Sequence, residues 1–147
     1  MEVAIGGVLY GVISVYAPIE DKTEKEKCEF YSEIDSALEN MSRSARENAL
    51  VCGDFNAAVG PMDNAMRNDL IGPFVGKQIV PNENNSMFMQ CCISNGLSTA
   101  STFFDNQERG TFKPVGKVEF TRTIDHILCA RKVETVARCG VMGEFIM

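Results

Sequence analysis

Residues 49–56 read ALVCGDFN, an apolar run that ends in two polar side chains, Asp54 and Asn56. The apolar run predicts a short buried strand, and Gly53 suits a turn at its end. Functional side chains of α/β sheets gather at the carboxyl ends of strands. Asp54 can bind a hard cation or take a proton, and Asn56 offers a donor and an acceptor to a phosphate or a water. The same string also suits an ordinary tight turn, because Asp and Asn bond their own backbone.

The N-terminal residues predict a β-hairpin. Residues 1–5 and 8–16 are largely apolar and flank Gly6-Gly7, which supplies the turn. Glu2 stands where a signal peptide has basic residues, and no run of about 18 apolar residues follows. We therefore expect an intracellular protein, nuclear or cytoplasmic, with no membrane contact.

A helix is predicted between this hairpin and the strand before Asp54. Residues 23–26, TEKE, have the form of a capping box, and apolar residues follow at helical spacing as far as Met41. This pattern predicts an amphipathic helix of about 18 residues. The polar stretch 42–48 then leads into the strand. The order strand, helix, strand implies a right-handed crossover in an α/β layer.

A long loop and a second helix are predicted next. Residues 57–83 are rich in Gly, Pro and Asn, and loops of this length are usually functional or disordered. The helix is expected over 85–95, capped by Asn84 or Asn85 and ended by Gly96.

Three more strands are predicted downstream, over 97–104, from Thr111-Phe112 onward, and over 123–129. Asp125 lies within the last of these, where an unpaired carboxylate is costly, so it needs a histidine, a cation or backbone donors as a partner. The ordinary alternative is a carboxylate bonded to a neighbouring loop. The whole order predicts an α/β fold of the α+β sandwich type, with two β-layers flanked by helices in one domain over 1–147.

Composition and charge narrow the class of protein. The 147 residues are 45% hydrophobic and 23% charged, as in a globular protein, and the net charge of −6 argues against a general nucleic-acid coat. Residues 1–99 carry 7 basic and 14 acidic side chains, whereas 100–147 carry 7 and 6. A polyanion would therefore meet the C-terminal third first. Its basic residues include Arg109, Lys113, Lys117, Arg122, Arg131 and Lys132.

The cysteines do not indicate a structural metal. Six cysteines show no CxxC spacing, and one histidine cannot complete a zinc set of the usual pattern. Several lie in apolar runs, where a free cysteine behaves as a small hydrophobe. We interpret this as a protein of a reducing compartment.

Five segments together resemble the endonuclease/exonuclease/phosphatase superfamily, closest to the apurinic-type endonuclease domain of non-LTR retrotransposons and to craniofacial-development-protein-2-like proteins. The segments are VISVYAP at 12–18, LVCGDFNAAVG at 50–60, SNGL at 94–97, STFF at 101–104 and TIDHIL at 123–128. They occur in the family's order and span nearly the whole chain. The resemblance implies an incomplete copy of the DNase I-like fold and hydrolysis of a phosphodiester or phosphomonoester with Mg²⁺, or with Mn²⁺ in its place.

The resemblance also implies roles for particular residues. Asp54 would activate the attacking water or protonate the leaving oxygen, and Asn56 would orient phosphate or water; both would hold the metal. Tyr16 would contact the phosphate, and Asp125 would hold a catalytic histidine. Thr111-Phe112 would line the DNA side of the cleft.

Departures from the family lead us to expect impaired activity. The Gln-Glu motif with the main metal-binding glutamate is expected before residue 1, and the Ser-Asp-His motif with the catalytic histidine after Met147. His126 is interpreted as a packed strand histidine and not as the catalytic one. We therefore expect a partial domain truncated at both ends.

Three functions stay open at this level. The chain is an active Mg²⁺-dependent endonuclease, a catalytically impaired remnant of one, or a binding module that keeps the fold and grips nucleic acid or protein. The expected substrate is DNA, although the chemistry alone also suits phospholipid or inositol-phosphate esters. Missing domain segments or a reverse transcriptase in the parent protein are the other partners that the resemblance implies.

Overall fold

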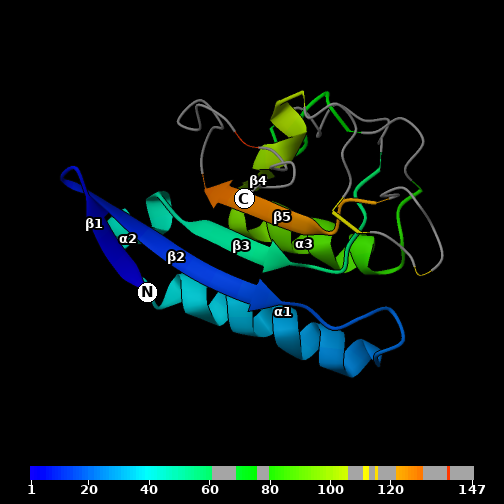
Figure 1. Cartoon of the computed structure of the whole chain (residues 1–147). Coiled ribbons are helices and arrows are strands. Elements are labelled where there is room, and N and C mark those ends of the chain that lie inside the picture. Colours follow the sequence, from blue (N-terminus) through cyan, green and yellow to red (C-terminus); the bar gives the residue numbers. More distant parts are fainter. Residues whose placement is uncertain are drawn as a thin grey trace.

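The computed structural model describes residues 1–60, 69–75, 80–105, 111, 112, 115, 122–130 and 139. Its elements are β1 (Glu2–Ile5), β2 (Val8–Tyr16), α1 (Glu24–Glu39), α2 (Arg43–Glu47), β3 (Leu50–Asp54), α3 (Asn84–Asn95), β4 (Leu97–Thr99), the 3₁₀ helix η2 (Ala100–Phe103) and β5 (Asp125–Ala130). Figure 1 shows these elements as a sheet with helices packed along it.

The sheet has five strands in the order β1-β2-β3-β5-β4. β2 and β3 are parallel, which confirms the predicted strand-helix-strand unit, and the other three pairs are antiparallel. The fold is therefore of the mixed α/β class. A second sheet, which the predicted sandwich requires, is not found among the residues that the structure describes.

Both long helices cover the same face of the sheet, as Figure 1 shows. The core between them contains Leu38 of α1, Phe88 of α3, Val51 of β3 and Leu128 of β5, all almost fully buried. Burying one such side chain stabilises the fold by about 1.5–3 kcal/mol. The opposite sheet face carries a second, smaller hydrophobic cluster around Cys129 at one end and the polar residues described below at the other.

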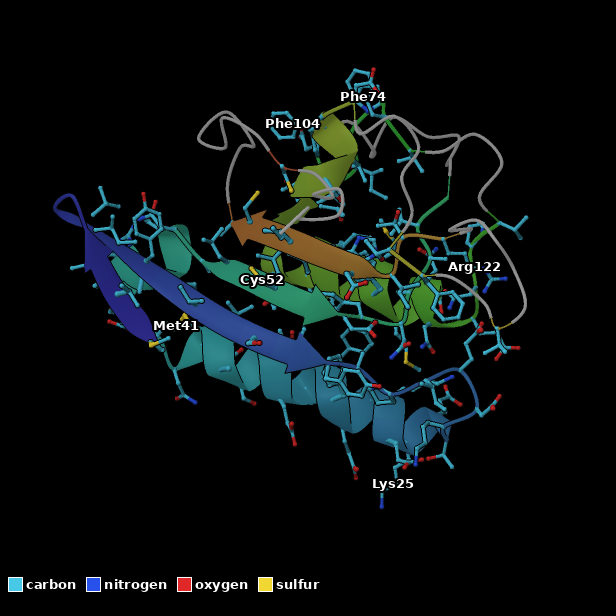
Figure 2. The ribbon with its side chains drawn as sticks, viewed as in Figure 1. Lys25, Met41, Cys52, Phe74, Phe104 and Arg122 are labelled. Carbon is cyan, nitrogen blue, oxygen red and sulfur yellow. The ribbon has the colours of Figure 1, made fainter. Side chains whose placement is uncertain are left out.

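Helix α1 forms for the reasons that its sequence indicates. The Thr23 hydroxyl accepts a hydrogen bond from the Glu26 N–H, and the Glu26 carboxylate accepts one from the Thr23 N–H, so the predicted capping box is confirmed. The helix buries Ile34 and Leu38. Its outer face is charged, and Lys25 points away from the sheet in Figure 2. The ion pairs on this face are exposed, so water screens them and they add little to the stability of the fold.

Helix α3 ends as predicted but begins differently. Gly96 has φ 60° and stops the helix in the left-handed conformation that glycine tolerates best. The N-cap is Glu83, with no side-chain capping bond, so the prediction that Asn84 or Asn85 caps the helix is wrong. The Asn84 amide instead donates to two carbonyls outside the helix.

Two predicted spans need correction. The stretch 42–48 contains the short helix α2, capped by the Ser42 hydroxyl, because that oxygen accepts the Ala45 N–H. The strand predicted over 97–104 ends at Thr99 and continues as η2. There the Thr102 hydroxyl donates to the Thr99 carbonyl, a local bond that competes with strand pairing.

The remaining sequence predictions concern the loops and the basic residues of the C-terminal third. The described parts of 57–83 contain no named helix or strand, in agreement with the predicted loop. Phe112 forms an isolated bridge with Arg122. The other basic residues named above, Arg109, Lys113, Lys117, Arg131 and Lys132, lie outside the described residues. No helix within the described part of the chain is long and apolar enough to cross a membrane.

Candidate functional site

Tyr16, Asp54 and Asp125 lie in one row across three adjacent strands. In the parallel pair Tyr16 is the register partner of Asp54, and in the antiparallel pair Asp54 is the partner of Asp125. Directly opposed residues project to the same face of a sheet. Three of the predicted site residues, which are far apart in the sequence, are therefore brought together.

The row lies on the sheet face away from the helices. Side chains alternate along a strand, and Val51, three residues before Asp54, and Phe55, directly after it, are fully buried in the helix-covered core. Asp54 thus projects to the other face. On this face Tyr16 is 74% exposed, so its phenol is accessible to a ligand.

A tight turn follows Asp54 and carries Asn56. Gly53 has φ 146°, and a Cβ there would lie 2.0 Å from the Val15 carbonyl oxygen, so only glycine fits. Asn56 has φ 47°, in the left-handed region that Asn tolerates. Its N–H donates to Asp54 Oδ1 at 2.8 Å, and its Nδ2 donates to the Ala17 carbonyl at 2.8 Å. Asp54 and Asn56 therefore form a tight turn, as one hypothesis predicted, and the same turn places them as candidate site residues.

The Asp54 carboxyl is held in an environment that favours its protonated form. Partial burial raises its pKa, the N–H of Asn56 acts in the opposite direction, and the facing Asp125 carboxylate raises it again. The net pKa is above the ordinary value for Asp. Asp54 is consequently a better proton acceptor than a fully solvated carboxylate. It is also the last residue of β3 and not the first residue beyond it.

Asp125 lies at the start of β5, which corrects its expected place inside an apolar strand. It is exposed, so it avoids the desolvation that we expected to demand a partner. The Thr111 hydroxyl oxygen accepts the N–H groups of Ile124 and Asp125, at 3.0 and 3.2 Å. Thr111 therefore braces the backbone at the site. Phe112 beside it is 40% exposed.

His126 projects into the core, as interpreted from the sequence. It is 3% exposed, packs against Phe88 and Phe55, and places Nε2 2.8 Å from the Ala57 carbonyl oxygen. Burial lowers its pKa to about 4. Because neighbouring residues of a strand point to opposite faces, this ring and the Asp125 side chain lie on different sides of the sheet.

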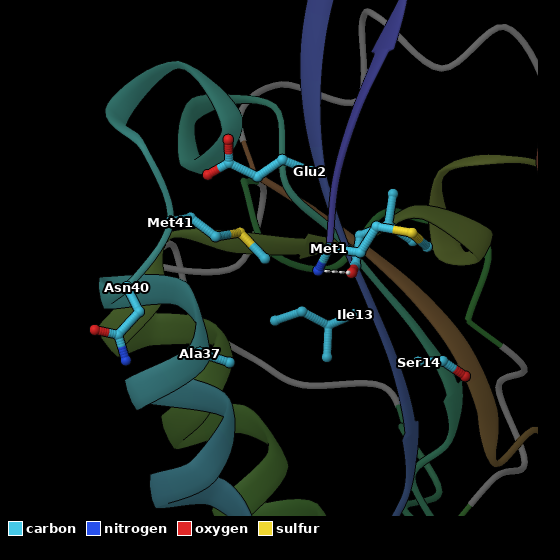
Figure 3. A pocket seen from close by; sticks show the side chains of 8 residues that line it. Met1, Glu2, Ile13, Ser14, Ala37, Asn40 and Met41 are labelled. Atoms are coloured by element: carbon cyan, nitrogen blue, oxygen red, sulfur yellow. Dashed lines mark hydrogen bonds between the residues drawn. The ribbon is translucent and has the colours of Figure 1, made fainter.

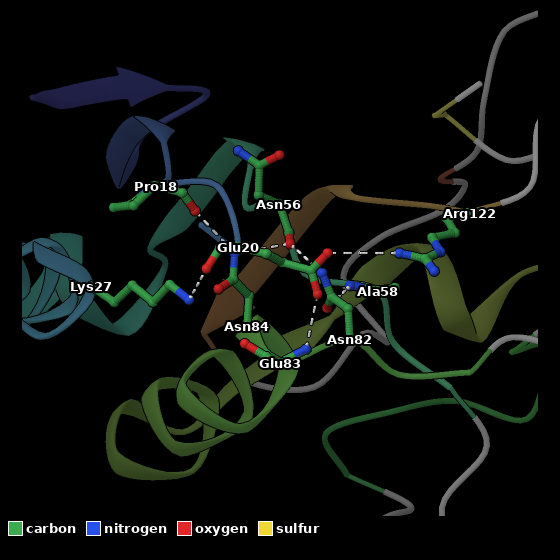
Figure 4. A network of polar contacts seen from close by, with 9 residues as sticks. All are labelled: Pro18, Glu20, Lys27, Asn56, Ala58, Asn82, Glu83, Asn84 and Arg122. Carbon is green, nitrogen blue, oxygen red and sulfur yellow. Dashed lines mark hydrogen bonds and ion pairs between the residues drawn. The ribbon is translucent and has the colours of Figure 1, made fainter. Parts of the chain in front are cut away.

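Sequence reasoning missed a polar network behind the turn. Figure 4 shows Asn82 and Asn84 bonded to the backbone at Asn56, and Glu20 bonded to Glu83 and paired with Arg122. Asn82 Nδ2 and Asn84 Nδ2 both donate to the Asn56 carbonyl, at 2.7 and 3.1 Å. The only signal was the asparagine-rich stretch PNENN at 81–85, which we interpreted as a loop and a helix cap.

The donor set suits a hard cation in part. Asp54 and Asp125 offer carboxylate oxygens and Asn56 an amide oxygen, and Mg²⁺ is commonly held by one or two carboxylates with several waters. Within the described residues, no group of three or more His, Cys, Asp or Glu side chains is arranged to hold a metal ion. The described residues therefore offer oxygen ligands of the kind that Mg²⁺ prefers, but not a complete metal site.

A separate groove lies beside the middle of β2. It is lined by Met1, Ile13, Ala37, Met41 and neighbouring residues and has a volume of about 450 Å³. Figure 3 shows it between the N-terminal strands and α1, with the Met1 ammonium donating to the Val12 carbonyl. None of the predicted site residues lines it.

Comparisons with known proteins add no assignment. No protein-family model matches the chain, and no curated protein matches it.

Proposed function

We propose that the row Tyr16, Asp54 and Asp125, together with Asn56, is the centre of a Mg²⁺-dependent phosphodiester hydrolase site of the endonuclease type. The observation that carries this proposal is the shared register of the three residues at one end of the sheet. The sheet would be one layer of a DNase I-like sandwich. Mn²⁺ would substitute for Mg²⁺ on the same oxygens.

Each side chain has a task that suits its position. Asp54, which accepts the Asn56 N–H and faces Asp125, would take the proton of the attacking water. The Asn56 amide, fixed by its bond to the Ala17 carbonyl, would orient a phosphate oxygen. The exposed Tyr16 phenol would donate to the phosphate. The metal, when bound to Asp54 and Asn56, supplies charge stabilisation at the phosphoryl group.

Turnover by this chain is expected to be slow. The sequence has a single histidine, and that ring is buried with Nε2 beside the Ala57 carbonyl. This chain therefore supplies no imidazole that Asp125 could orient. The described residues also supply only part of a metal shell, which is a second reason to expect slow turnover. DNA is the proposed substrate, with Thr111 and Phe112 on its side of the cleft.

A binding module without chemistry is the second candidate, since the absence of a complete ligand set among the described residues favours it. It would grip DNA through Tyr16 and the basic C-terminal third. The net charge of −6 opposes tight binding of this kind.

The two candidates separate in one set of assays. Isothermal titration with Mn²⁺ should detect binding to the wild-type chain that Asp54→Ala abolishes, together with weak or negligible nicking of supercoiled plasmid in Mg²⁺. Robust nicking that Asp54→Ala removes would show a fully competent enzyme. DNA retention that survives Asp54→Ala and falls with salt, without cation binding, would favour the binding module and contradict the hydrolase site.

A further inference from the structure

The turn at Asn56 needs support from outside itself. A residue other than glycine in the left-handed region costs about 1 kcal/mol, and Asn56 is the one such residue in the part of the chain that the structure describes. Its N–H orients the Asp54 carboxylate and its side chain bonds the Ala17 carbonyl. A change in the φ angle of Asn56 would therefore move both proposed ligands.

Two asparagines supply that support. Asn84 Nδ2 donates to the Asn56 carbonyl at 3.1 Å and to the Pro18 carbonyl at 2.9 Å. Asn82 Nδ2 donates to the Asn56 carbonyl at 2.7 Å, and Asn82 Oδ1 accepts the Ala58 N–H at 2.8 Å. We call Asn82 and Asn84 the amide clamp. Both amides donate to the Asn56 carbonyl, and Asn82 also accepts the N–H of Ala58, two residues further along the loop.

The burial of the Asn84 side chain costs free energy, and a role in starting helix α3 does not account for it. It is 3% exposed, and its Oδ1 is buried without a hydrogen-bond partner. Such an orphaned acceptor costs about 1–3 kcal/mol. The residue does not cap α3, because the N-cap is Glu83. The Asn84 side chain instead donates hydrogen bonds to the Asn56 and Pro18 carbonyls.

The clamp is anchored to the rest of the fold. The Glu20 carboxylate accepts the Glu83 N–H at 3.1 Å, and the Glu20 carbonyl accepts Lys27 Nζ at 2.7 Å. Figure 4 shows that the first bond ties the start of α3 to the segment after β2 and that the second ties α1 to the same segment. A second carboxylate oxygen of Glu20 lies 3.9 Å from the Arg122 guanidinium. Asn84 thus stands on a fixed helix end.

We propose that Asn84, assisted by Asn82, is a positioning residue that fixes the Asn56 turn and so sets the arrangement of Asp54 and Asn56 as ligands. This inference rests on the proposed function for its purpose, and on the hydrogen bonds to the Asn56 carbonyl for its mechanism. Groups that orient ligands from behind typically change metal affinity about 10–100-fold when removed.

The test uses Asn84→Ala and Asn84→Asp in the full chain. Asn84→Asp keeps the size of the side chain but sets an oxygen against two carbonyl oxygens. The control is Asn95→Ala, which removes amide bonds to Asp35 and the Cys91 carbonyl at the far end of the same helix. Asn82→Ala removes the other donor from a half-buried position and serves if the Asn84 variants do not fold.

Two measurements decide the outcome. NMR scalar couplings report the φ angle of Asn56, and titration with Mn²⁺ alone reports affinity. We expect the clamp variants to lose the left-handed signature of Asn56 and to bind Mn²⁺ about tenfold more weakly, whereas Asn95→Ala changes only the melting temperature. Folded clamp variants with an unchanged Asn56 signature would overturn the inference. If wild-type protein binds no Mn²⁺, the proposed function fails, but the couplings still test the clamp.

Discussion

Asp54 and Asp125 are directly opposed residues of the antiparallel pair β3–β5, so their carboxylates share one face of the sheet. Like charges in this arrangement destabilise the pair of strands. A cation between or beside them would relieve the repulsion. The stability of the fold should therefore respond to divalent cations through these two residues.

Asp54→Asn should stabilise the protein in the absence of cations. The substitution removes one of two facing charges and keeps an oxygen that can accept the Asn56 N–H. Because the site is largely solvated, we expect a small rise in melting temperature of about 1–3 °C. Millimolar MgCl₂ should raise the melting temperature of the wild type but not of the variant. Equal responses of both proteins to Mg²⁺ would place the cation elsewhere.

Asp125→Asn should lower the pKa of Asp54 toward its ordinary value. The Asp125 carboxylate is one cause of the raised pKa of Asp54, although burial is the larger one. Carbon-detected NMR titration of the Asp54 carboxyl measures this directly. Asp21→Asn, in the loop before α1, is the control and should leave the titration unchanged. A pKa of Asp54 that does not move would show that the two carboxylates are uncoupled.

His126 should make the fold unstable in acid. Burial lowers the pKa of the folded imidazole from 6.5 to about 4. The unfolded chain therefore binds a proton that the folded chain excludes. The free energy of unfolding should fall as the pH drops from about 6.5 to about 4, by about 3 kcal/mol from this group.

The control for this effect is His126→Gln, which cannot titrate in that range. Urea unfolding at several pH values should give the variant a lower stability at neutral pH but a flatter dependence between pH 6.5 and 4. A wild-type stability that rises as the pH falls through this window would contradict the sign of the effect.

Gly53→Ala should disrupt the site more than other glycine substitutions. The new Cβ would lie 2.0 Å from the Val15 carbonyl oxygen in β2, so the pairing of β2 and β3 must shift. We expect a loss of at least about 3 kcal/mol in the free energy of unfolding. Gly6→Ala, with φ 58° but open space around it, should cost about 1 kcal/mol. Urea unfolding that gives similar losses for both variants would rule out the close contact.

Local sequence predicted which residues form the candidate site, but not how they are arranged in space. The strings around Tyr16, Asp54 and Asp125 each indicated a polar residue at a strand end, and their resemblance to one family joined them. Their common register follows from the pairing of β2, β3 and β5. Asn84 could not be found in this way, because an asparagine before a helix is typical of an ordinary cap.

The sequence by itself determined the elements that local forces specify. The hairpin at Gly6-Gly7, the capped helix α1, the end of α3 at Gly96 and the strand before Asp54 all depend on side chains within a few residues. Only the tertiary structure decided the common register of Tyr16, Asp54 and Asp125 and the amide clamp on Asn56. These depend on strand register and on hydrogen bonds between residues far apart in the chain, which no local pattern encodes.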